Sequence, residues 1–205
     1  MSVSELDPAR KELIDAVSHE LCEIDGPTDQ AMKRYSGVLY RELDALSLRG
    51  TARRRLDRDV LIVSGMWGLV GARDPIPWYK LKMSARIDGL GRLSTWWRPA
   101  VTDALAPRVK GSEVWDLLPV EHSGAVDWSV LAPRRRTTIR FIDRSGAVVA
   151  HWNKLLKGSV VRWLAETGAR RPEDLAAFEH PRGYVFDVQA SIIDANRAQV
   201  VMREK

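Results

Sequence analysis

The sequence predicts an α/β fold, with α+β as the alternative, built as a single compact domain in which helices flank a mixed central sheet. Three observations lead to this class. Apolar residues recur at helical spacing in the N-terminal part, up to about residue 58. After residue 59, short apolar runs typical of buried strands alternate with helical segments. The length of 205 residues is enough for a substantial core. We therefore expect one domain over residues 1–205, mainly helical over 1–58 and built of sheet and helices over 59–205.

Helices are expected throughout the N-terminal part. The first should begin near Pro8 with Asp7 as its N-cap, because proline suits the first turn and aspartate accepts hydrogen bonds from the free amides there. The sequence Asp25-Gly26-Pro27 then interrupts the chain. The expected helices of this part cover residues 7–21, 27–34 and 38–46, followed by a short one that contains residues 53–55.

The remaining residues should form the sheet and its covering helices. The apolar run 59–64 is typical of a fully buried strand, and Asp143-Arg-Ser-Gly146 between two apolar runs predicts a hairpin. Pro75 and Pro77 should keep residues 74–82 irregular or extended. The expected strands are 59–64, 113–118, 137–142 and 147–150, with 184–187 and a final run to 201 as edge strands. The expected helices are 93–105 (with Pro99 near the first turn), 153–168 and 172–178.

Charge and cysteine usage narrow the functional class. The formal net charge is +5, which favours an anionic partner: DNA, a nucleotide or another phosphorylated ligand. The single cysteine, Cys22, cannot form an internal disulfide and is typical of a buried thiol in a reducing compartment, with redox sensing as the less favoured alternative. There is no apolar signal region and no apolar run long enough to span a bilayer, so we expect a cytoplasmic protein without membrane association.

Residues 151–164 contain the clearest candidate for an anion site. A helix over this stretch would place apolar residues on one face and cationic residues on the opposite arc. An asparagine cap would leave free amide donors beside two ammonium groups, an arrangement that suits phosphate. Gly158 would permit close approach of another backbone or of a phosphate. The alternative is an ordinary amphipathic helix with a solvated basic face. The expected anion-binding residues here are His151, Asn153, Lys154, Lys157 and Arg162.

Two further segments contain candidate catalytic groups. Ser64 ends a predicted strand and enters a glycine-containing turn, although its flanks do not follow the G-x-S-x-G pattern and a tight structural turn is the favoured interpretation. Glu121 and His122 follow another predicted strand and together could transfer protons. The histidine spacing matches no metal-binding motif, and neither a P-loop nor a dinucleotide fingerprint is present. We therefore expect no metal and no cofactor.

Seven short segments, in order, resemble the peroxide stress protein YaaA family, also called DUF328 or UPF0246. They extend over nearly the whole chain, and their combination is more specific than any one of them. The matching segments are Tyr35-Ser-Gly-Val-Leu-Tyr40, Val63-Ser-Gly-Met-Trp-Gly-Leu69, Arg73-Asp-Pro-Ile-Pro-Trp-Tyr79-Lys-Leu-Lys-Met83, Trp97-Arg-Pro99, Trp115-Asp-Leu-Leu118, Lys154-Leu-Leu-Lys-Gly158, and Pro172-Glu-Asp-Leu-Ala-Ala-Phe178 with Gly183-Tyr-Val-Phe-Asp187.

The resemblance implies a compact α/β fold with a positively charged cleft and a helix-hairpin-helix-like element. It also implies DNA binding and a role in limiting iron-driven oxidative damage, with no catalytic reaction firmly attached. Ser64, Arg73, Tyr79 and Lys154 stand at matching positions, whereas Lys157 stands where many members carry arginine. Family members usually open with a strand and a Pro-Pro-Ser-Glu-Gly-Lys segment, and this sequence opens MSVSELDPAR, so we expect a relative shortened at its N-terminus.

Three functions follow from these observations. The leading one is a DNA-binding protein of the peroxide or oxidative stress response, which binds the nucleic-acid backbone in a basic cleft. Its contacts would come from Arg73, Lys154, Lys157 and Arg162, with Trp67 or Tyr79 for base stacking. The second is an enzyme acting on a nucleotide, nucleobase or phosphorylated small molecule, in a specialised biosynthetic pathway, with Ser64, Glu121 or His122 near the reacting atom. The third is a structural or partner-binding module whose eight tryptophans lie in the core.

Overall fold

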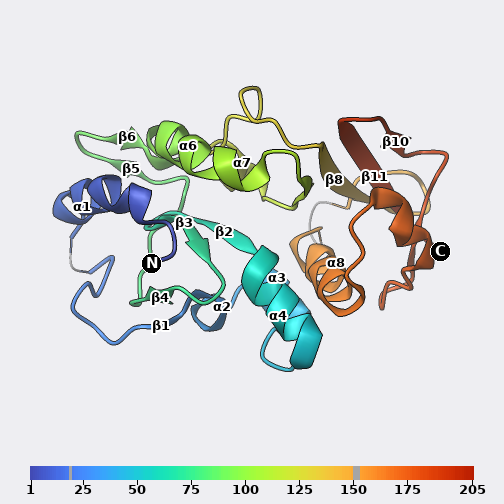
Figure 1. The fold of residues 1–205 in the computed structure, drawn as a ribbon, viewed down its shortest axis with the longest axis horizontal. Helices are drawn as coiled ribbons and strands as arrows, with labels where there is room; N and C mark the ends of the chain where they lie inside the picture. The colour runs from blue at the N-terminus through green and yellow to red at the C-terminus, as the bar shows by residue number, and fades with distance from the viewer. Residues whose placement is uncertain (19, 150–152) are drawn as a thin grey trace. The chain divides into compact units, whose positions relative to one another are not determined.

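The computed structural model describes residues 1–18, 20–149 and 153–205, and its chain divides into two compact units (Figure 1). The first unit comprises Met1–Tyr35, Asp57–Arg108 and Leu118–Leu131, and the second comprises Ser36–Leu56, Val109–Leu117 and Ala132–Lys205. Helices and strands occur in both, and the second contains a mixed five-stranded sheet. The predicted α/β class is confirmed, while the single-domain organisation stays a prediction.

The first unit combines short helices with paired strands. Its strands form three antiparallel pairs: β1 with β4, β2 with β3, and β5 with β6. The strands are β1 (Asp29–Gln30), β2 (Leu61–Ser64), β3 (Gly68–Gly71), β4 (Pro75–Ile76), β5 (Arg86–Ile87) and β6 (Gly91–Arg92). The helices are η1 (Ser4–Leu6), α1 (Asp7–Ala16), α2 (Ala31–Arg34), α5 (Leu93–Trp96), α6 (Arg98–Val109, of which Val109 falls in the second unit) and α7 (Val120–Ser123).

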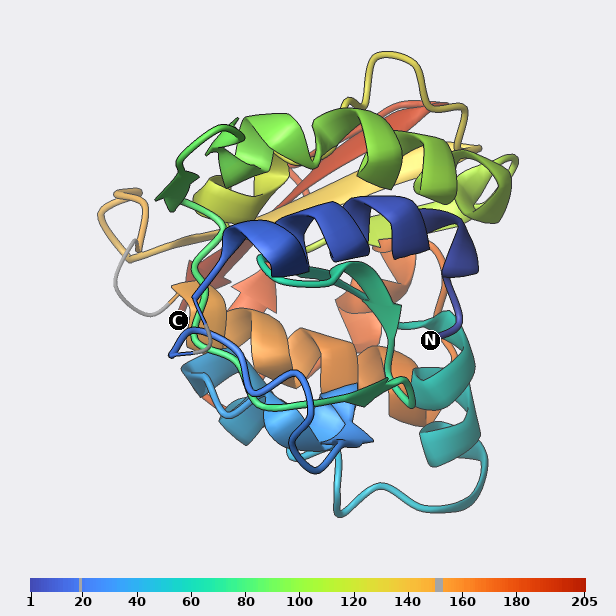
Figure 2. The same ribbon diagram turned by 90° about the vertical axis from the view of Figure 1, so that its left-hand side faces the viewer.

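A buried arginine fastens α1 to the β2–β3 hairpin. Arg10 is only 3% exposed, and its guanidinium donates hydrogen bonds to the carbonyls of Val3, Trp67 and Leu69 at 2.8 to 3.1 Å. It also pairs with Asp7 at 2.7 Å. A buried cation is costly unless acceptors surround it, and here backbone carbonyls supply them. Figure 2 shows α1, in dark blue, lying along this hairpin.

The β2–β3 hairpin corrects one expectation for the sheet. The apolar run after residue 59 is indeed a buried strand, but its partner is the next strand along the chain and not the five-stranded sheet. Ser64 pairs with Gly68 across a turn of three residues. Gly68 closes this turn with φ +68°, a conformation that favours glycine, and a Cβ there would lie 2.7 Å from the ring of Trp97. The chain therefore returns at once as an antiparallel strand.

The second unit is built on the mixed sheet and the helix α8 (Asn153–Thr167). The strand order is β10-β11-β8-β7, with β9 also paired to β11. Strands β7, β8 and β11 run parallel, whereas β9 and β10 are antiparallel to β11. The strands are β7 (Glu113–Asp116), β8 (Arg135–Ile142), β9 (Tyr184–Phe186), β10 (Ile192–Ile193) and β11 (Arg197–Glu204); the remaining helices are α3 (Val38–Leu43), α4 (Gly50–Asp59, ending in the first unit) and η2 (Pro172–Ala177).

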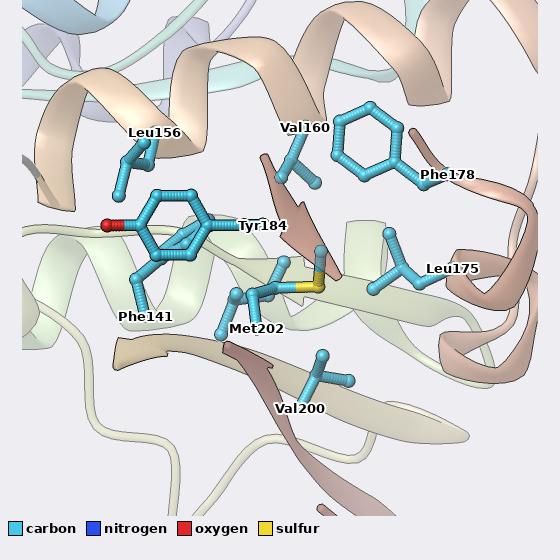
Figure 3. Packing of buried hydrophobic residues seen from close by; sticks show 9 residues of the cluster. Phe141, Leu156, Val160, Leu175, Phe178, Tyr184, Val200 and Met202 are labelled. Atoms are coloured by element: carbon cyan, nitrogen blue, oxygen red, sulfur yellow. The ribbon is translucent and has the colours of Figure 1, made fainter. Parts of the chain in front are cut away.

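The core of the second unit lies between α8 and the sheet. Figure 3 shows Leu156 and Val160 of α8 pointing toward Phe141 of β8 and Met202 of β11. Tyr184 of β9 meets Phe141 edge-on, with ring centroids 5.3 Å apart. Burying side chains of this size contributes about 1.5–3 kcal/mol each. The apolar face expected for residues 153–168 is therefore the face that packs on the sheet.

Several predicted boundaries hold and others move. Pro99 lies in the first turn of α6, and a bridge between Ile142 and Val148 closes the predicted hairpin. The first helix ends at Ala16 because Val17 adopts an extended conformation. The last strand is not an edge strand: β11 lies between β10 and β8, since its parallel pairing to β8 places it inside the sheet. Within the described ranges, no helix combines the length and apolar character needed to cross a bilayer.

Candidate functional site

The basic arc of α8 faces the helix α3 at its centre. Figure 2 shows α8 and α3 side by side, and the two helices are in extensive contact. A Cβ on Gly158 would lie 2.8 Å from the Cβ of Glu42 and 3.1 Å from the backbone nitrogen of Leu43. Of the two uses foreseen for Gly158, the structure shows close approach of another backbone.

Arg162 is engaged at the end of α3. Its Nη1 donates to the carbonyl oxygens of Leu43 and Asp44 at 3.0 and 3.2 Å and to Ser47 Oγ at 3.0 Å. Its Nε also pairs with Glu166 at 2.9 Å. Asp44 has φ 45° and ends α3, so the guanidinium satisfies carbonyls that the helix leaves without partners. Arg162 thus acts as a C-terminal cap.

Lys157 lies in a charged cluster at the end of β7. Its Nζ donates to the carbonyl of Leu117 at 3.3 Å. Burial lowers the pKa of the Lys157 ammonium, and the nearby Asp116 carboxylate acts in the opposite direction. Asp116 is 8% exposed and accepts two hydrogen bonds from Arg136, at 2.6 and 3.0 Å. The β7 end therefore combines a half-buried ammonium with a buried, paired carboxylate.

The other expected residues of this stretch differ in their surroundings. Lys154 is exposed on the first turn of α8. Asn153 is the first residue of α8, and its Oδ1 is buried without a hydrogen-bond partner in the described part of the chain. His151 falls outside the described residues. The anion-binding roles of these residues stay predictions.

In the first unit, three hydroxyl groups form a chain that includes Ser64. Ser64 Oγ lies 2.9 Å from the Tyr79 hydroxyl, which lies 2.9 Å from the Tyr35 hydroxyl. Ser64 Oγ also accepts a hydrogen bond from the Trp67 amide at 3.0 Å, which braces the β2–β3 turn. Burial raises the pKa of Tyr79, while its hydrogen bonds to Ser64 and Tyr35 work against that rise. Neither partner of Ser64 is a general base at neutral pH, and the geometry favours the structural interpretation of this serine.

The Trp67 ring is not available for the base stacking expected of it, whereas the stacking role of Tyr79 stays a prediction. Trp67 is 3% exposed, and its Nε1 is buried without a hydrogen-bond partner among the described residues. Tyr79 meets it edge-on at a centroid distance of 6.3 Å. A base could not reach the Trp67 ring in this arrangement. The exposed tryptophan of this region is Trp78, at 41%.

The remaining candidate residues also lie in the first unit. Arg73 is exposed and follows β3. Glu121 and His122 belong to α7, where Glu121 Oε1 lies 3.8 Å from His122 Nδ1. Neither hydrogen-bonds to Ser64, whose partners are Trp67 and Tyr79. The structure brings Ser64 together with Tyr79, Glu121 with His122, and Lys157 with Asp116.

Cys22 has the character expected of a buried thiol. Its side chain is fully buried, and burial raises its pKa to about 11, with Glu23 contributing in the same direction. Such a thiol is almost wholly protonated at neutral pH and is a poor nucleophile. Over the described residues, no group of three or more His, Cys, Asp or Glu side chains is arranged to hold a metal ion.

Sequence reasoning missed a surface of the first unit that includes Trp78, Lys80 and Lys82. All three are exposed, while the intervening Leu81 and the following Met83 are buried. The signal was present, because polar and apolar residues alternate here with the period of an extended chain.

Comparison with known proteins places the chain in a family. The family model of peroxide stress protein YaaA matches residues 3–190. A UPF0246 protein of Streptomyces coelicolor is 35% identical over 159 residues, which are 76% of this chain and 61% of that protein. UPF0246 proteins of Laribacter hongkongensis and Corynebacterium glutamicum (strain R) are 32% and 33% identical, over 79% and 78% of this chain and 66% and 65% of their own lengths. These matches span less than two thirds of each relative.

The family match agrees with the resemblance drawn from the seven segments, since it extends across the β2–β3 hairpin, the segment after Arg73 and α8. The chain therefore belongs to the peroxide stress protein YaaA family.

Proposed function

We propose that this protein binds DNA through the phosphate backbone, in the cytoplasm, as part of the peroxide stress response. Its membership of the YaaA family supports the physiological setting, and the net charge of +5 supports a polyanionic partner. The observation that carries the proposal is the exposure of cations in both units. Arg73 in the first unit and Lys154 in the second are exposed and are accessible to phosphate.

The hydrogen bonds of two other cations support a narrower choice of phosphate-binding residues. Arg162 is held by three acceptors at the end of α3, and Lys157 is half-buried against Leu117. A phosphate would have to replace these interactions. We therefore assign phosphate binding to Arg73 and Lys154. We assign Lys157 and Arg162 a role in stabilising the folded structure.

Fluorescence anisotropy with a labelled DNA duplex tests this assignment. Arg73→Ala and Lys154→Ala, measured separately, should weaken binding and reduce the slope of log K against log salt by about 0.9 for each phosphate that the variant no longer neutralises. Lys11→Ala is the matched control, because Lys11 is an exposed lysine on α1. Slopes equal to that of the control in both variants would contradict the assignment.

The charged cluster at the end of β7 favours a second candidate: an enzyme acting on a nucleotide or a phosphorylated small molecule. A half-buried lysine of lowered pKa beside a buried carboxylate is the kind of perturbed pair that occurs at catalytic sites. In this hypothesis Lys157 binds the phosphate and Asp116 orients the arginine Arg136.

A thermal-shift screen of nucleoside monophosphates and inorganic phosphate tests the second candidate. Binding to the native state should raise Tm as ligand concentration rises. Lys157→Gln should abolish the shift, whereas Lys154→Gln should keep it. A flat response across the screen would rule against this enzyme hypothesis.

A further inference from the structure

An extended segment of the first unit presents an aromatic ring and two cations on one side. Trp78 is 41% exposed, and Lys80 and Lys82 are also exposed. Leu81 and Met83 point inward and are 8% and 0% exposed. Because side chains of an extended chain alternate, Trp78, Lys80 and Lys82 follow one another on the outer side, about 6.6 Å apart along the chain.

The backbone of this segment is held firmly from beneath. The amide of Lys80 donates to Leu21 O at 2.7 Å, and the carbonyl of Trp78 accepts from the Glu23 amide at 3.0 Å. Gly65 passes so close that a Cβ there would lie 2.5 Å from the Leu81 carbonyl oxygen. The exposed side chains therefore stand on a fixed support, and little backbone entropy remains to be lost when a ligand binds.

The hairpin that follows adds two more cations. Arg86 of β5 lies directly opposite Arg92 of β6, and both are exposed. Like charges at directly opposite positions destabilise a strand pair. Among the residues that the structure describes, neither guanidinium has an ion-pair partner, and a polyanion would relieve the repulsion.

We propose that Trp78, Lys80, Lys82, Arg86 and Arg92, here called the Trp78 strip, form a binding surface for single-stranded DNA. A base stacks on the exposed indole of Trp78, and the lysines and arginines contact the phosphates of the same strand. Exposed aromatic rings interleaved with cations are the usual means of binding single strands, and a base paired inside a duplex cannot stack on such a ring. The inference rests on the proposed function and specifies the form of DNA bound.

The full chain is titrated into fluorescein-labelled oligo-dT of about 15 nucleotides, with a duplex of equal length in parallel, at several salt concentrations. Trp78→Ala should weaken single-strand binding about fivefold to hundredfold and leave the salt slope unchanged, because stacking is not ionic. Trp78→Phe keeps a ring and should recover most of the affinity. Lys80→Ala with Lys82→Ala should instead reduce the slope, by about 0.7 for each cation.

Controls separate this inference from the proposed function. Lys11→Ala removes an exposed lysine of the same unit outside the strip and should change neither the affinity of the strip nor the effect of Trp78→Ala. Circular dichroism and thermal melts confirm that each variant folds. If the unmodified chain binds DNA and the strip variants match Lys11→Ala, the strip is overturned while DNA binding stands. If the unmodified chain shows no salt-sensitive binding to either the single strand or the duplex, both the Trp78 strip and the proposed DNA-binding function are overturned.

An oligo-U of the same length completes the test, because a stacking tryptophan accepts bases on either sugar. Binding of DNA and RNA with the same weakening in Trp78→Ala supports the strip. Binding of RNA alone, or duplex binding as tight as single-strand binding, overturns its assignment to single-stranded DNA.

Discussion

Gly158 of α8 lies against the backbone of Leu43 in α3, so close that a Cβ on the glycine would lie 3.1 Å from the Leu43 nitrogen. Glycine inside a helix normally costs about 1 kcal/mol relative to alanine. Here the cost is offset because the missing side chain at Gly158 lets the backbone of α3 pack directly against α8.

Gly158→Ala should therefore destabilise the protein, against the usual direction for this change in a helix. The added methyl would also lie 2.8 Å from the Cβ of Glu42, and overpacking of this kind costs about 1–3 kcal/mol. Urea unfolding measures the effect. Gly37→Ala is the control for an added methyl without overpacking, since its nearest new neighbour would lie an ordinary 3.8 Å away, in Tyr40. Because Gly37 is the N-cap of α3, where alanine is less favourable than glycine, this variant should lose no more than about 1 kcal/mol. A Gly158→Ala protein as stable as the unmodified protein would show that α3 and α8 are packed less tightly than these distances imply.

Substitution of Arg162 should destabilise the protein, whereas substitution of Lys154 should not. Arg162→Met removes the cap of α3 and leaves the Leu43 and Asp44 carbonyls without that donor, which should lower the free energy of unfolding by about 1–3 kcal/mol. Lys154→Met should leave stability within about 0.5 kcal/mol, because Lys154 is exposed. Chemical denaturation of both variants decides this. An Arg162→Met protein of unchanged stability but impaired DNA binding would contradict the structural role and show that Arg162 contacts DNA.

How far the sequence predicts this molecule depends on the range of the interactions involved. The apolar face of α8 and the turn at Gly68 follow from local patterns, and both were predictable. The partner of Arg162 was not, because α3 lies more than a hundred residues earlier in the chain. A basic arc on a helix looks the same in sequence whether it meets phosphate or carbonyl groups.

Aromatic residues illustrate the same limit. Trp67 of the glycine-containing turn was expected, as an alternative to Tyr79, to stack on bases, and it is buried. Trp78 was expected only to lie in an irregular or extended segment with Pro75 and Pro77, and it is exposed. What exposes Trp78 is the anchoring of residues 78–83 against Leu21, Glu23 and Gly65, and this anchoring is set by tertiary structure.

His180 should make the second unit less stable in mild acid. It is 5% exposed among Phe141, Phe178 and Tyr184, with ring centroids 5.3 to 5.6 Å away. Its Nε2 lies 3.2 Å from Leu156 O, and its Nδ1 accepts a hydrogen bond from the Arg182 amide at 3.1 Å, which requires the neutral ring.

The lowered pKa of His180 determines how the free energy of unfolding changes with pH. Burial lowers the pKa of His180, against the effects of the Leu156 carbonyl and Glu42. Above the unfolded-state pKa of about 6.5 the ring is neutral in both states and its contribution is complete. As pH falls below that value, the unfolded state takes up the proton first, so stability declines until the folded-state pKa is reached. Urea unfolding between pH 7.5 and 5 should show this decline, and His180→Gln should flatten it; an unchanged pH profile in that variant would contradict the account.

Cys22 should be unreactive in the native protein. With its pKa raised to about 11, the fraction present as thiolate at pH 7 is on the order of 1 in 10,000, and the side chain is fully buried. Labelling with a thiol reagent should be slow in buffer and rapid in concentrated urea, and millimolar peroxide should leave the native thiol intact. Rapid labelling of the native protein would contradict this prediction and favour redox sensing by Cys22.

The most direct test of the central claim is the salt dependence of DNA binding by the unmodified chain. The protein should bind labelled DNA, and log K should fall steeply and linearly with log salt between about 50 and 200 mM, roughly in proportion to the number of phosphates contacted. Binding that is undetectable at 50 mM salt, or that does not change with salt, would contradict it.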